Sequence, residues 1–152
     1  MIQKPSSVVV DASVVLKWQL DDEDCISQAT ALRDDFYIRG TIIVIAPHLL
    51  VYEVVNGIVT AARHKRIAPD MIVFALSNLM ALDVQLREVE PLRILETALK
   101  YNLSAYDAAY LSLAQTEKCE LWTGDKAFYQ AIKGKSPLIR WIGKYKPRAN
   151  HN

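Results

Sequence analysis

The chain has 152 residues, of which 51% are hydrophobic and 23% charged, as is usual for one globular domain with a buried core. This composition excludes a disordered chain, and the uncharged stretch at residues 41–52 is too short to span a membrane. The N-terminus lacks the apolar segment of a signal peptide, and Cys25 and Cys119 have neither metal-binding nor disulfide spacing. We therefore expect one domain, residues 1–152, in the cytoplasm and with no membrane partner.

Apolar runs and helical segments alternate along the chain. In chain order we expect a strand at residues 8–10, two helices within 13–39, a strand at 41–46, helices at 47–66 and 69–82, a strand at 84–86, helices at 92–101 and 104–118, a strand at 121–123, a helix at 126–133 and a strand at 138–142. Strands connected through helices normally pair in parallel by right-handed crossovers. The expected fold class is therefore α/β, a three-layer α/β/α sandwich with a mostly parallel central sheet.

Two element boundaries carry a specific expectation. Pro47 is expected to be the first residue of its helix, where a missing N–H costs nothing. The acidic run Asp21–Asp24 is expected to be a solvated turn that favours the N-terminus of the second helix, because negative charge there suits the helix dipole.

Three acidic residues lie where strands end or a helix begins. Asp11 follows the first strand directly, Asp125 follows the strand at 121–123, and Asp107 lies in the first turn of its helix. In an open parallel sheet the functional crevice lies outside the carboxyl ends of the strands. We therefore expect the three carboxylates to face one crevice.

Glu53 would join them from the helix at 47–66. Asn56 lies three residues further on the same helix face, where it could orient the Glu53 carboxylate or a water molecule. Ser13, two residues after Asp11, is either a hydroxyl partner of the site or a helix cap. Four acids at one end of a sheet favour a divalent cation, since Mg²⁺ and Mn²⁺ prefer oxygen ligands.

Each acid also has a structural interpretation. Asp11 and Asp125 could cap the helices that follow them, and Ser104 with Asp107 resembles a capping box. Glu53 could be a surface acid that pairs with a lysine. Taken singly these interpretations are at least as good as the functional one, but three caps and one helix acid at a single sheet edge favour a shared site.

The net charge of +1 is unevenly distributed. Residues 133–152 contain six basic and no acidic residues, whereas the rest of the chain contains twelve basic and seventeen acidic ones. A basic tail from about residue 143 suggests contact with a polyanion, although a solvated terminus is an equal alternative. Candidate phosphate contacts are Arg63, Lys65, Arg66, Lys126, Lys144, Lys146 and Arg148. The cations at 63–66 also suit a helix C-terminus, which needs no ligand to explain them.

Four motifs together resemble the PIN-domain ribonucleases, and most closely the VapC-type toxins of toxin–antitoxin pairs. They are Val-Val-Asp11-Ala-Ser13, Glu53-x-x-Asn56, Tyr106-Asp107-Ala-Ala-Tyr110 and Thr123-x-Asp125-x-x-Phe128. The resemblance covers nearly the whole chain, in order and at typical spacings.

This resemblance implies an endoribonuclease that depends on Mg²⁺ or Mn²⁺. It implies that Asp11, Glu53, Asp107 and Asp125 bind the metal, supported by Ser13, Asn56 and Thr123 through hydrogen bonds. It also implies a homodimer and a cognate antitoxin that inserts a segment near the site. Some relatives carry a further acid close to the third or fourth one, which is absent here, so we expect one tightly held ion.

Two competing functions remain open. The chain could be a non-catalytic module that grips RNA or a protein, or a metal-dependent phosphatase or DNA nuclease on the same kind of sheet. Acids at all four motif positions argue against the first, and activity on RNA, DNA and a small phosphate ester would separate the three.

Overall fold

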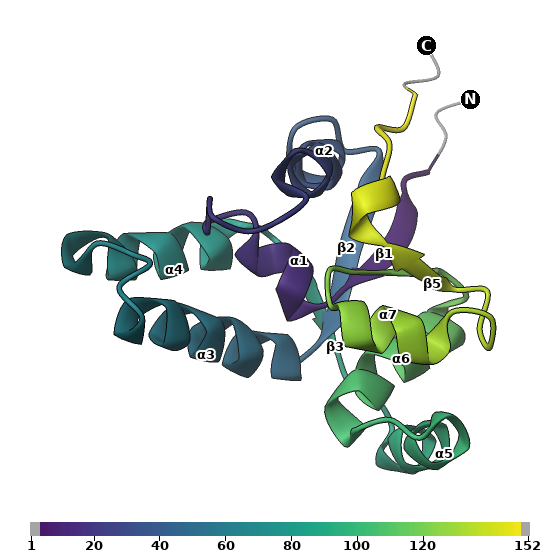
Figure 1. Ribbon diagram of the computed structural model, residues 1–152. Helices are drawn as coiled ribbons and strands as arrows, with labels where there is room; N and C mark the ends of the chain where they lie inside the picture. Colours follow the sequence, from purple (N-terminus) through teal and green to yellow (C-terminus); the bar gives the residue numbers. More distant parts are fainter. Residues whose placement is uncertain (1–3, 150–152) are drawn as a thin grey trace.

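Five short apolar segments pair side by side into one sheet (Figure 1). The structure is a computed structural model and describes residues 4–149. The strands lie in the order β3-β2-β1-β4-β5, and all four pairings are parallel. The central strand is buried on both faces, which explains why Val8–Val10 is continuously apolar. The strand bounds are β1 Ser6–Val10, β2 Ile42–Pro47, β3 Gln85–Arg87, β4 Glu120–Thr123 and β5 Ile139–Trp141.

Helices cover both faces of this sheet. In Figure 1, α1–α4 lie on one side of the strands and α5–α7 on the other, with α4 packed on α3 and α5 packed on α6. No helix of the described part is long and apolar enough to cross a membrane. The helix bounds are α1 Ala12–Leu16, α2 Ile26–Tyr37, α3 Leu49–Arg63, α4 Ile72–Ala81, α5 Pro91–Tyr101, α6 Ala105–Glu117 and α7 Lys126–Ile132, with 3₁₀ turns η1 Pro69–Met71 and η2 Ile142–Lys144.

The direction in which the chain adds strands to the sheet changes at the boundary between β1 and β4. From β1 the chain moves outward to β2 and then β3, and it next crosses to β4 and β5 on the other side of β1. Because right-handed crossovers that run in opposite directions lie on opposite faces, the connections diverge above the ends of β1 and β4. Ligands of open α/β sheets bind at such a point.

The α/β fold predicted from the sequence is confirmed, and each predicted strand and helix is present. The role predicted for Pro47 is wrong. Pro47 is the last residue of β2, paired in register with Arg87, and α3 begins at Leu49 after His48. A strand end tolerates the missing N–H of proline as well as a helix start does.

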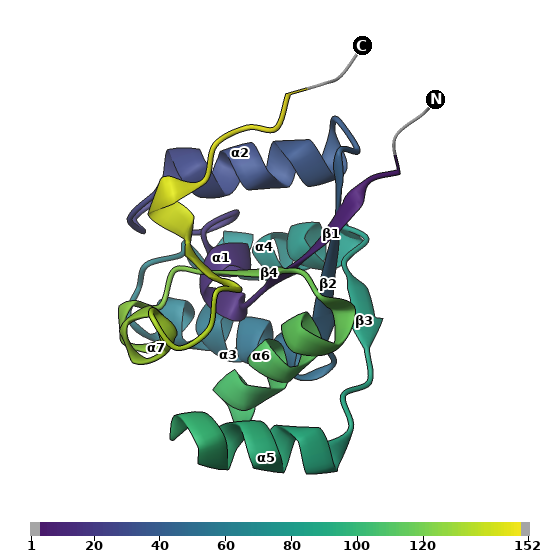
Figure 2. The ribbon, with the colours of Figure 1, turned by 90° about the vertical axis from the view of Figure 1, so that its right-hand side faces the viewer.

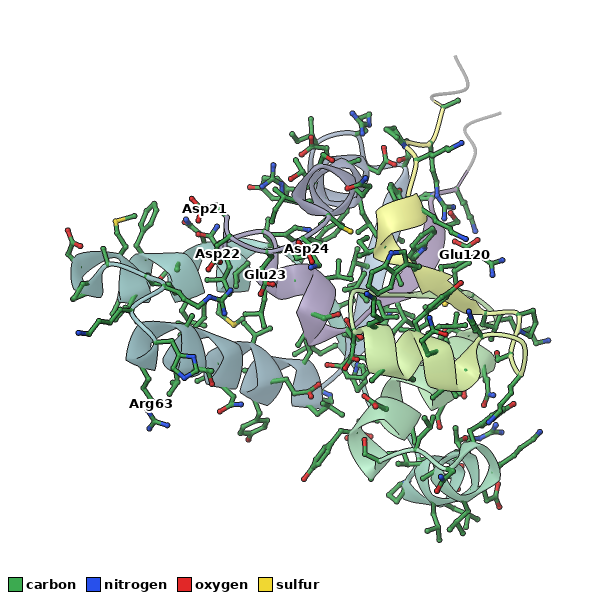
Figure 3. All side chains as sticks on the ribbon, in the orientation of Figure 1. Asp21, Asp22, Glu23, Asp24, Arg63 and Glu120 are labelled. Atoms are coloured by element: carbon green, nitrogen blue, oxygen red, sulfur yellow. The ribbon has the colours of Figure 1, made fainter. Side chains whose placement is uncertain are left out.

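The acidic run Asp21–Asp24 is a turn, as predicted, but it does not serve the dipole of α2. The first turn of α2 contains no acid, and its N-cap is Cys25 in the left-handed conformation, with φ 60°. Arg66, beyond the end of α3, instead binds both Asp22 oxygens at 2.8 Å and Glu23 at 3.2 Å. The turn therefore ties the α1–α2 connection to the C-terminal end of α3 (Figure 3).

The C-terminal segment is bound to the body of the protein. The fully buried Asp35 of α2 accepts hydrogen bonds from the Tyr145 hydroxyl at 2.6 Å, the Arg148 backbone N–H at 2.9 Å and the Arg39 Nε–H at 2.7 Å. These donors satisfy a carboxylate that would otherwise be costly to bury, and they hold the pKa of Asp35 below its usual value against the opposing effect of burial.

Candidate active site

Asp11 lies at the end of the central strand and is nearly buried, with 6% of its surface exposed. It is the N-cap of α1, and its Oδ1 accepts a hydrogen bond from the Val14 N–H at 3.4 Å. The hydroxyls of Ser13 and Thr123 donate to its Oδ1 and Oδ2 respectively. Both carboxylate oxygens of Asp11 therefore have protein donors.

The same hydroxyls join the ends of β1 and β4. Ser13 Oγ accepts from the Gly124 N–H at 2.7 Å, and Thr123 Oγ1 accepts from the Asp125 N–H at 3.0 Å. Since β1 and β4 pair in parallel, with Val10 opposite Trp122, the two strands deliver these residues to one edge of the sheet. The structure thus places Ser13 and Thr123, the two predicted hydroxyl partners, against Asp11.

A glycine suits the position between Thr123 and Asp125. A Cβ on Gly124 would lie 2.6 Å from Lys17 Cε and 3.3 Å from Ser13 Oγ. Any side chain there would displace the buried stem of Lys17 and crowd the hydroxyl that contacts Asp11. The network therefore depends on close approach of α1 to this turn.

Asp125 and Asp107 lie at the starts of two helices. Asp125 caps α7, with its Oδ1 accepting from the Phe128 N–H at 3.1 Å, and the side chain is exposed. Ser104 caps α6 by accepting from the Asp107 N–H at 3.1 Å. The carboxylate of Asp107 forms no hydrogen bond or ion pair with the described residues, so it remains free for a ligand.

Glu53 reaches the site from α3. Its Oε1 accepts a hydrogen bond of 2.6 Å from the hydroxyl of Tyr110, which lies in α6 and is 1% exposed. Sequence reasoning assigned no role to Tyr110, although its position three residues after Asp107 puts it near the same face of α6. Asn56 is exposed and forms no hydrogen bond within the described residues, so the expected contact from Asn56 to Glu53 is not formed.

The charges of neighbouring carboxylates raise the pKa values of Asp11 and Asp107. Burial raises the pKa of Asp11 to about 7, against the hydrogen bonds from Ser13 and Thr123, and the charge of Asp125 raises it further. Burial also raises the pKa of Asp107 to about 6, helped by the charges of Asp125 and Glu53. Burial and then the Glu53 carboxylate raise the pKa of Tyr110, so its hydroxyl stays protonated and donates. We call Asp11, Glu53, Asp107 and Asp125 the acid cluster.

The acid cluster offers the oxygen ligands that a divalent cation prefers, but its carboxylates are not close enough together to form a complete binding site. None of the four carboxylates pairs with a cation among the described residues. Oxygens of Glu53, Asp107 and Asp125 have no donor among residues 4–149, which suits a hard cation. Within residues 4–149, however, no three acid, histidine or cysteine side chains already stand close enough to hold an ion.

The candidate RNA-binding cations divide into two groups. Arg66 is held by Asp22 and Glu23, and Arg148 donates to Glu120 at 3.0 Å and to Ser6 at 2.8 Å. Both guanidinium groups therefore have structural partners. The others are exposed and form no ion pair in the described part of the chain: Arg63, Lys65, Lys126, Lys144 and Lys146.

Arg63 is also distant from the acid cluster along α3. It lies ten residues after Glu53, which is about 15 Å along a helix. Figure 3 shows Arg63 near the far end of α3, directed away from the body of the protein. Lys126, in contrast, directly follows Asp125.

Comparison with known families decides the assignment of the fold. The family model of the PIN domain matches residues 8–134. The chain belongs to the PIN-domain family. PIN domains are generally nucleases, and those nucleases generally use a divalent metal ion. The match to the PIN model ends before β5, so η2, Lys144 and Lys146 lie beyond it.

The PIN assignment agrees with a solved structure. The chain is similar to PAE2754 from Pyrobaculum aerophilum, a crystal structure, with a TM-score of 0.64 and 22% sequence identity over 91% of this chain and 92% of that chain. At this identity the likeness supports the PIN fold alone. A comparison with curated proteins gives no match.

Proposed function

We propose that this PIN domain is a divalent-metal-dependent endoribonuclease, the toxin of a VapC-type toxin–antitoxin pair. The observation that carries the proposal is the mutual influence of these acids: the charge of Asp125 raises the pKa of Asp11, and the charges of Asp125 and Glu53 raise that of Asp107, beside the point where the sheet order reverses. Like charges gathered without a cationic partner favour a bound cation, and the substrate of a PIN nuclease is itself anionic.

The chain's own residues supply the coordination and its geometry. Glu53, Asp107 and Asp125 offer free carboxylate oxygens, and Asp11 would contribute with its lone pairs directed by Ser13 and Thr123. Tyr110 fixes one oxygen of Glu53 and leaves the other for the site. The bound Mg²⁺ or Mn²⁺ would neutralise the scissile phosphate and lower the pKa of a water molecule.

One ion is the simplest stoichiometry for this donor set. Lys126 follows Asp125, and the residues within two positions of Asp107 are not acidic. Since each further divalent ion needs further anionic ligands, a second ion would depend on oxygens of the RNA phosphate.

Lysines near the site and on the C-terminal segment are proposed to hold the RNA strand. Lys126, Lys144 and Lys146 are exposed and free of ion pairs in the described part. Arg63 and Lys65 are weaker candidates, because they lie at the far end of α3. Arg66 and Arg148 would contribute only after leaving acidic partners.

Exposed apolar side chains support the proposed protein partners. Tyr52 beside Glu53 and Tyr106 beside Asp107 are 79% and 66% exposed, and three leucines of α5 are also exposed. We propose these exposed side chains as contacts with a second copy of the chain. Val73 and Phe74 of α4 form a separate exposed apolar surface, which we propose for the antitoxin.

One observation favours a second candidate, a non-catalytic RNA- or protein-binding module. The carboxylates of the described residues are not assembled into a three-ligand site. A binding module would retain the PIN fold and grip RNA without needing the acids. The two candidates therefore differ in whether substitution of the acid cluster changes what the protein does to RNA.

A comparison of substrates and variants tests the proposal. We expect the protein to cleave single-stranded RNA with Mn²⁺ or Mg²⁺, and not with a chelator, and to leave DNA and a small phosphate ester intact. Asp11→Asn and Asp107→Asn should each lower the cleavage rate at least about 100-fold, because each removes a charge that holds the ion. Asp83→Asn, an exposed acid outside the acid cluster, is the matched control.

The result that would contradict a nuclease is RNA cleavage by purified Asp11→Asn at the parental rate. RNA binding without cleavage, and without sensitivity to Asp107→Asn, would select the non-catalytic module.

A further inference from the structure

A polar pocket of about 190 Å³ lies between α5 and α6, outside the acid cluster. Arg93, Glu96 and Lys100 line it from α5 at intervals of three and four residues, so they share one stripe of that helix. Ser112 and Gln115 line it from α6. Figures 1 and 2 show α5 on the outer side of α6, where this seam is the boundary between the two helices.

The floor of the pocket presents buried hydroxyl groups. Thr97 is 7% exposed and Ser112 is 2% exposed. Ser112 Oγ lies 3.0 Å from Thr97 Oγ1 and 3.3 Å from the carbonyl oxygen of Arg93, so its single proton can serve either acceptor. Gln115 Nε2 approaches Tyr101 Oη at 3.5 Å, a long contact that leaves both groups able to bind a ligand. The lining of the pocket is therefore largely polar.

The two cationic side chains of the pocket, Arg93 and Lys100, have no strong ion pair in the described part of the chain. Arg93 pairs with Glu90 at 3.6 Å, and both side chains are about 60% exposed, so this pair contributes little. Lys100 forms no ion pair in the described part of the chain, and its ammonium lies 5.3 Å from the ring centre of Tyr101. Glu96 is four residues before Lys100, yet no ion pair joins them there. Two available cations face one acid, which suits an anionic ligand.

We propose that this pocket binds one phosphate group of the RNA strand that the acid cluster cleaves. The inference rests on the proposed function for the identity of the strand. Arg93 would contact the phosphate through its planar donor group and Lys100 as a point charge, with the Thr97 hydroxyl below. A strand beside four carboxylates needs cations outside the acid cluster, and Arg93 and Lys100 would add to those of Lys126, Lys144 and Lys146.

The position of the pocket on α6 fits a flanking phosphate. Ser112 and Gln115 follow Asp107 by five and eight residues, which is about 7.5 to 12 Å along the helix. A phosphate held at that distance is not the scissile one. It would set where the strand enters the site without reading its bases.

Binding of inorganic phosphate to the full-length protein tests the pocket without RNA. The double variant Arg93→Gln/Lys100→Gln should lose the phosphorus-31 line broadening that the parent shows with phosphate. Glu96→Gln should bind phosphate several-fold more tightly, since it removes the acid from the pocket. The control Lys4→Gln/Arg33→Gln makes the same change in charge on the N-terminal segment and α2, which lies at the opposite end of the molecule from α5 (Figure 2).

RNA affinity against salt tests the source of the phosphate. In an Asp107→Asn background that does not cleave, the pocket double variant should lower RNA affinity about tenfold. It should also flatten the salt dependence by about 0.7 in slope, the value for one phosphate on a single strand. The control should leave the slope unchanged.

Three outcomes overturn the inference. Phosphate binding that the pocket variant does not weaken means that the pocket is not the anion site. Loss of phosphate binding with unchanged RNA affinity means that the pocket takes a free phosphate compound instead of RNA. If the parent neither binds nor cleaves RNA, the proposed function fails together with the RNA assignment, and the phosphate measurement alone shows whether the pocket binds an anion.

Discussion

At the scale of single residues, Asp11 is a helix cap and at the same time a member of the acid cluster. The sequence left open whether Asp11 is a helix cap or a site residue. The structure shows it capping α1 and also receiving the Ser13 and Thr123 hydroxyls. These donors orient the carboxylate, while burial keeps the free energy of its ionised form high.

The pH dependence of stability follows from the raised pKa of Asp11. The pKa is about 7 in the folded protein and near 4 when unfolded, so the folded state binds this proton more tightly. In the absence of metal, the contribution of Asp11 to folding free energy is therefore complete below about pH 4 and is lost as pH rises to about 7. We expect Asp11→Asn to be about 2 kcal/mol more stable than the parent at pH 7.5, and much closer to it at pH 5.

Chemical denaturation in a chelator at both pH values measures this difference. The asparagine has nearly the same shape, and its oxygen can accept from one hydroxyl while its NH2 donates to the oxygen of the other, so packing is little changed. A difference between variant and parent that is the same at pH 5 and pH 7.5 would show that the Asp11 charge is not the cause.

At the scale of elements, α3 and α6 meet at the site from opposite faces of the sheet. Their link is the hydrogen bond of 2.6 Å from Tyr110 to Glu53. Each helix also begins at the same sheet edge, α3 after β2 and α6 with its Ser104 cap. The relative placement of Glu53 and Asp107 therefore depends on one buried hydroxyl, and we assign Tyr110 as a positioning residue.

Tyr110→Phe tests this link. Because Glu53 is half-buried and water can replace the lost donor, we expect the free energy of unfolding to fall by only about 1 kcal/mol. The affinity for Mn²⁺ should fall about tenfold, as is typical when a group that orients a metal ligand is removed. Calorimetric titration of Mn²⁺ measures the change, with Tyr37→Phe on the exposed face of α2 as the control. Unchanged Mn²⁺ affinity would give Tyr110 a packing role alone.

At the scale of the whole molecule, the proposed metal binding would be coupled to folding through the acid cluster. Its four carboxylates come from β1, α3, α6 and the turn before α7, so they approach one another only in the folded chain. A cation that binds only the folded state stabilises it by RT ln(1 + [L]/Kd). It also lowers the repulsion among the carboxylates.

We therefore expect Mn²⁺ or Mg²⁺ at about ten times its Kd to raise the Tm by roughly 3–6 °C. The response should shrink in Asp11→Asn and persist in Asp70→Asn, whose exposed acid lies in η1 beyond α3. Differential scanning calorimetry with metal and with chelator provides the measurement. Equal Tm values under the two conditions would contradict a metal site.

Local sequence patterns were enough to predict the fold class and the elements that carry the acid cluster. Continuous apolar runs such as Val8–Val10 indicated strands buried on both faces, and their alternation with helices indicated a parallel sheet. The sequence also placed Asp11, Asp107 and Asp125 at element ends, because caps and strand ends have local sequence signals. Local signals misplaced Pro47, since a strand end and a helix start tolerate a missing N–H equally well.

Which side chains meet could be learned from the packed chain alone. Tyr110 contacts Glu53 at a sequence separation of 57 residues, and Arg66 contacts Asp22 at a separation of 44. Asp35 binds the C-terminal segment at a separation of more than 100 residues. Nothing local distinguishes these residues from an ordinary core tyrosine, a helix-end arginine or a helix aspartate. The free energy of such contacts depends on burial and on the neighbours that other elements bring, and those neighbours are set by the packing of the whole chain.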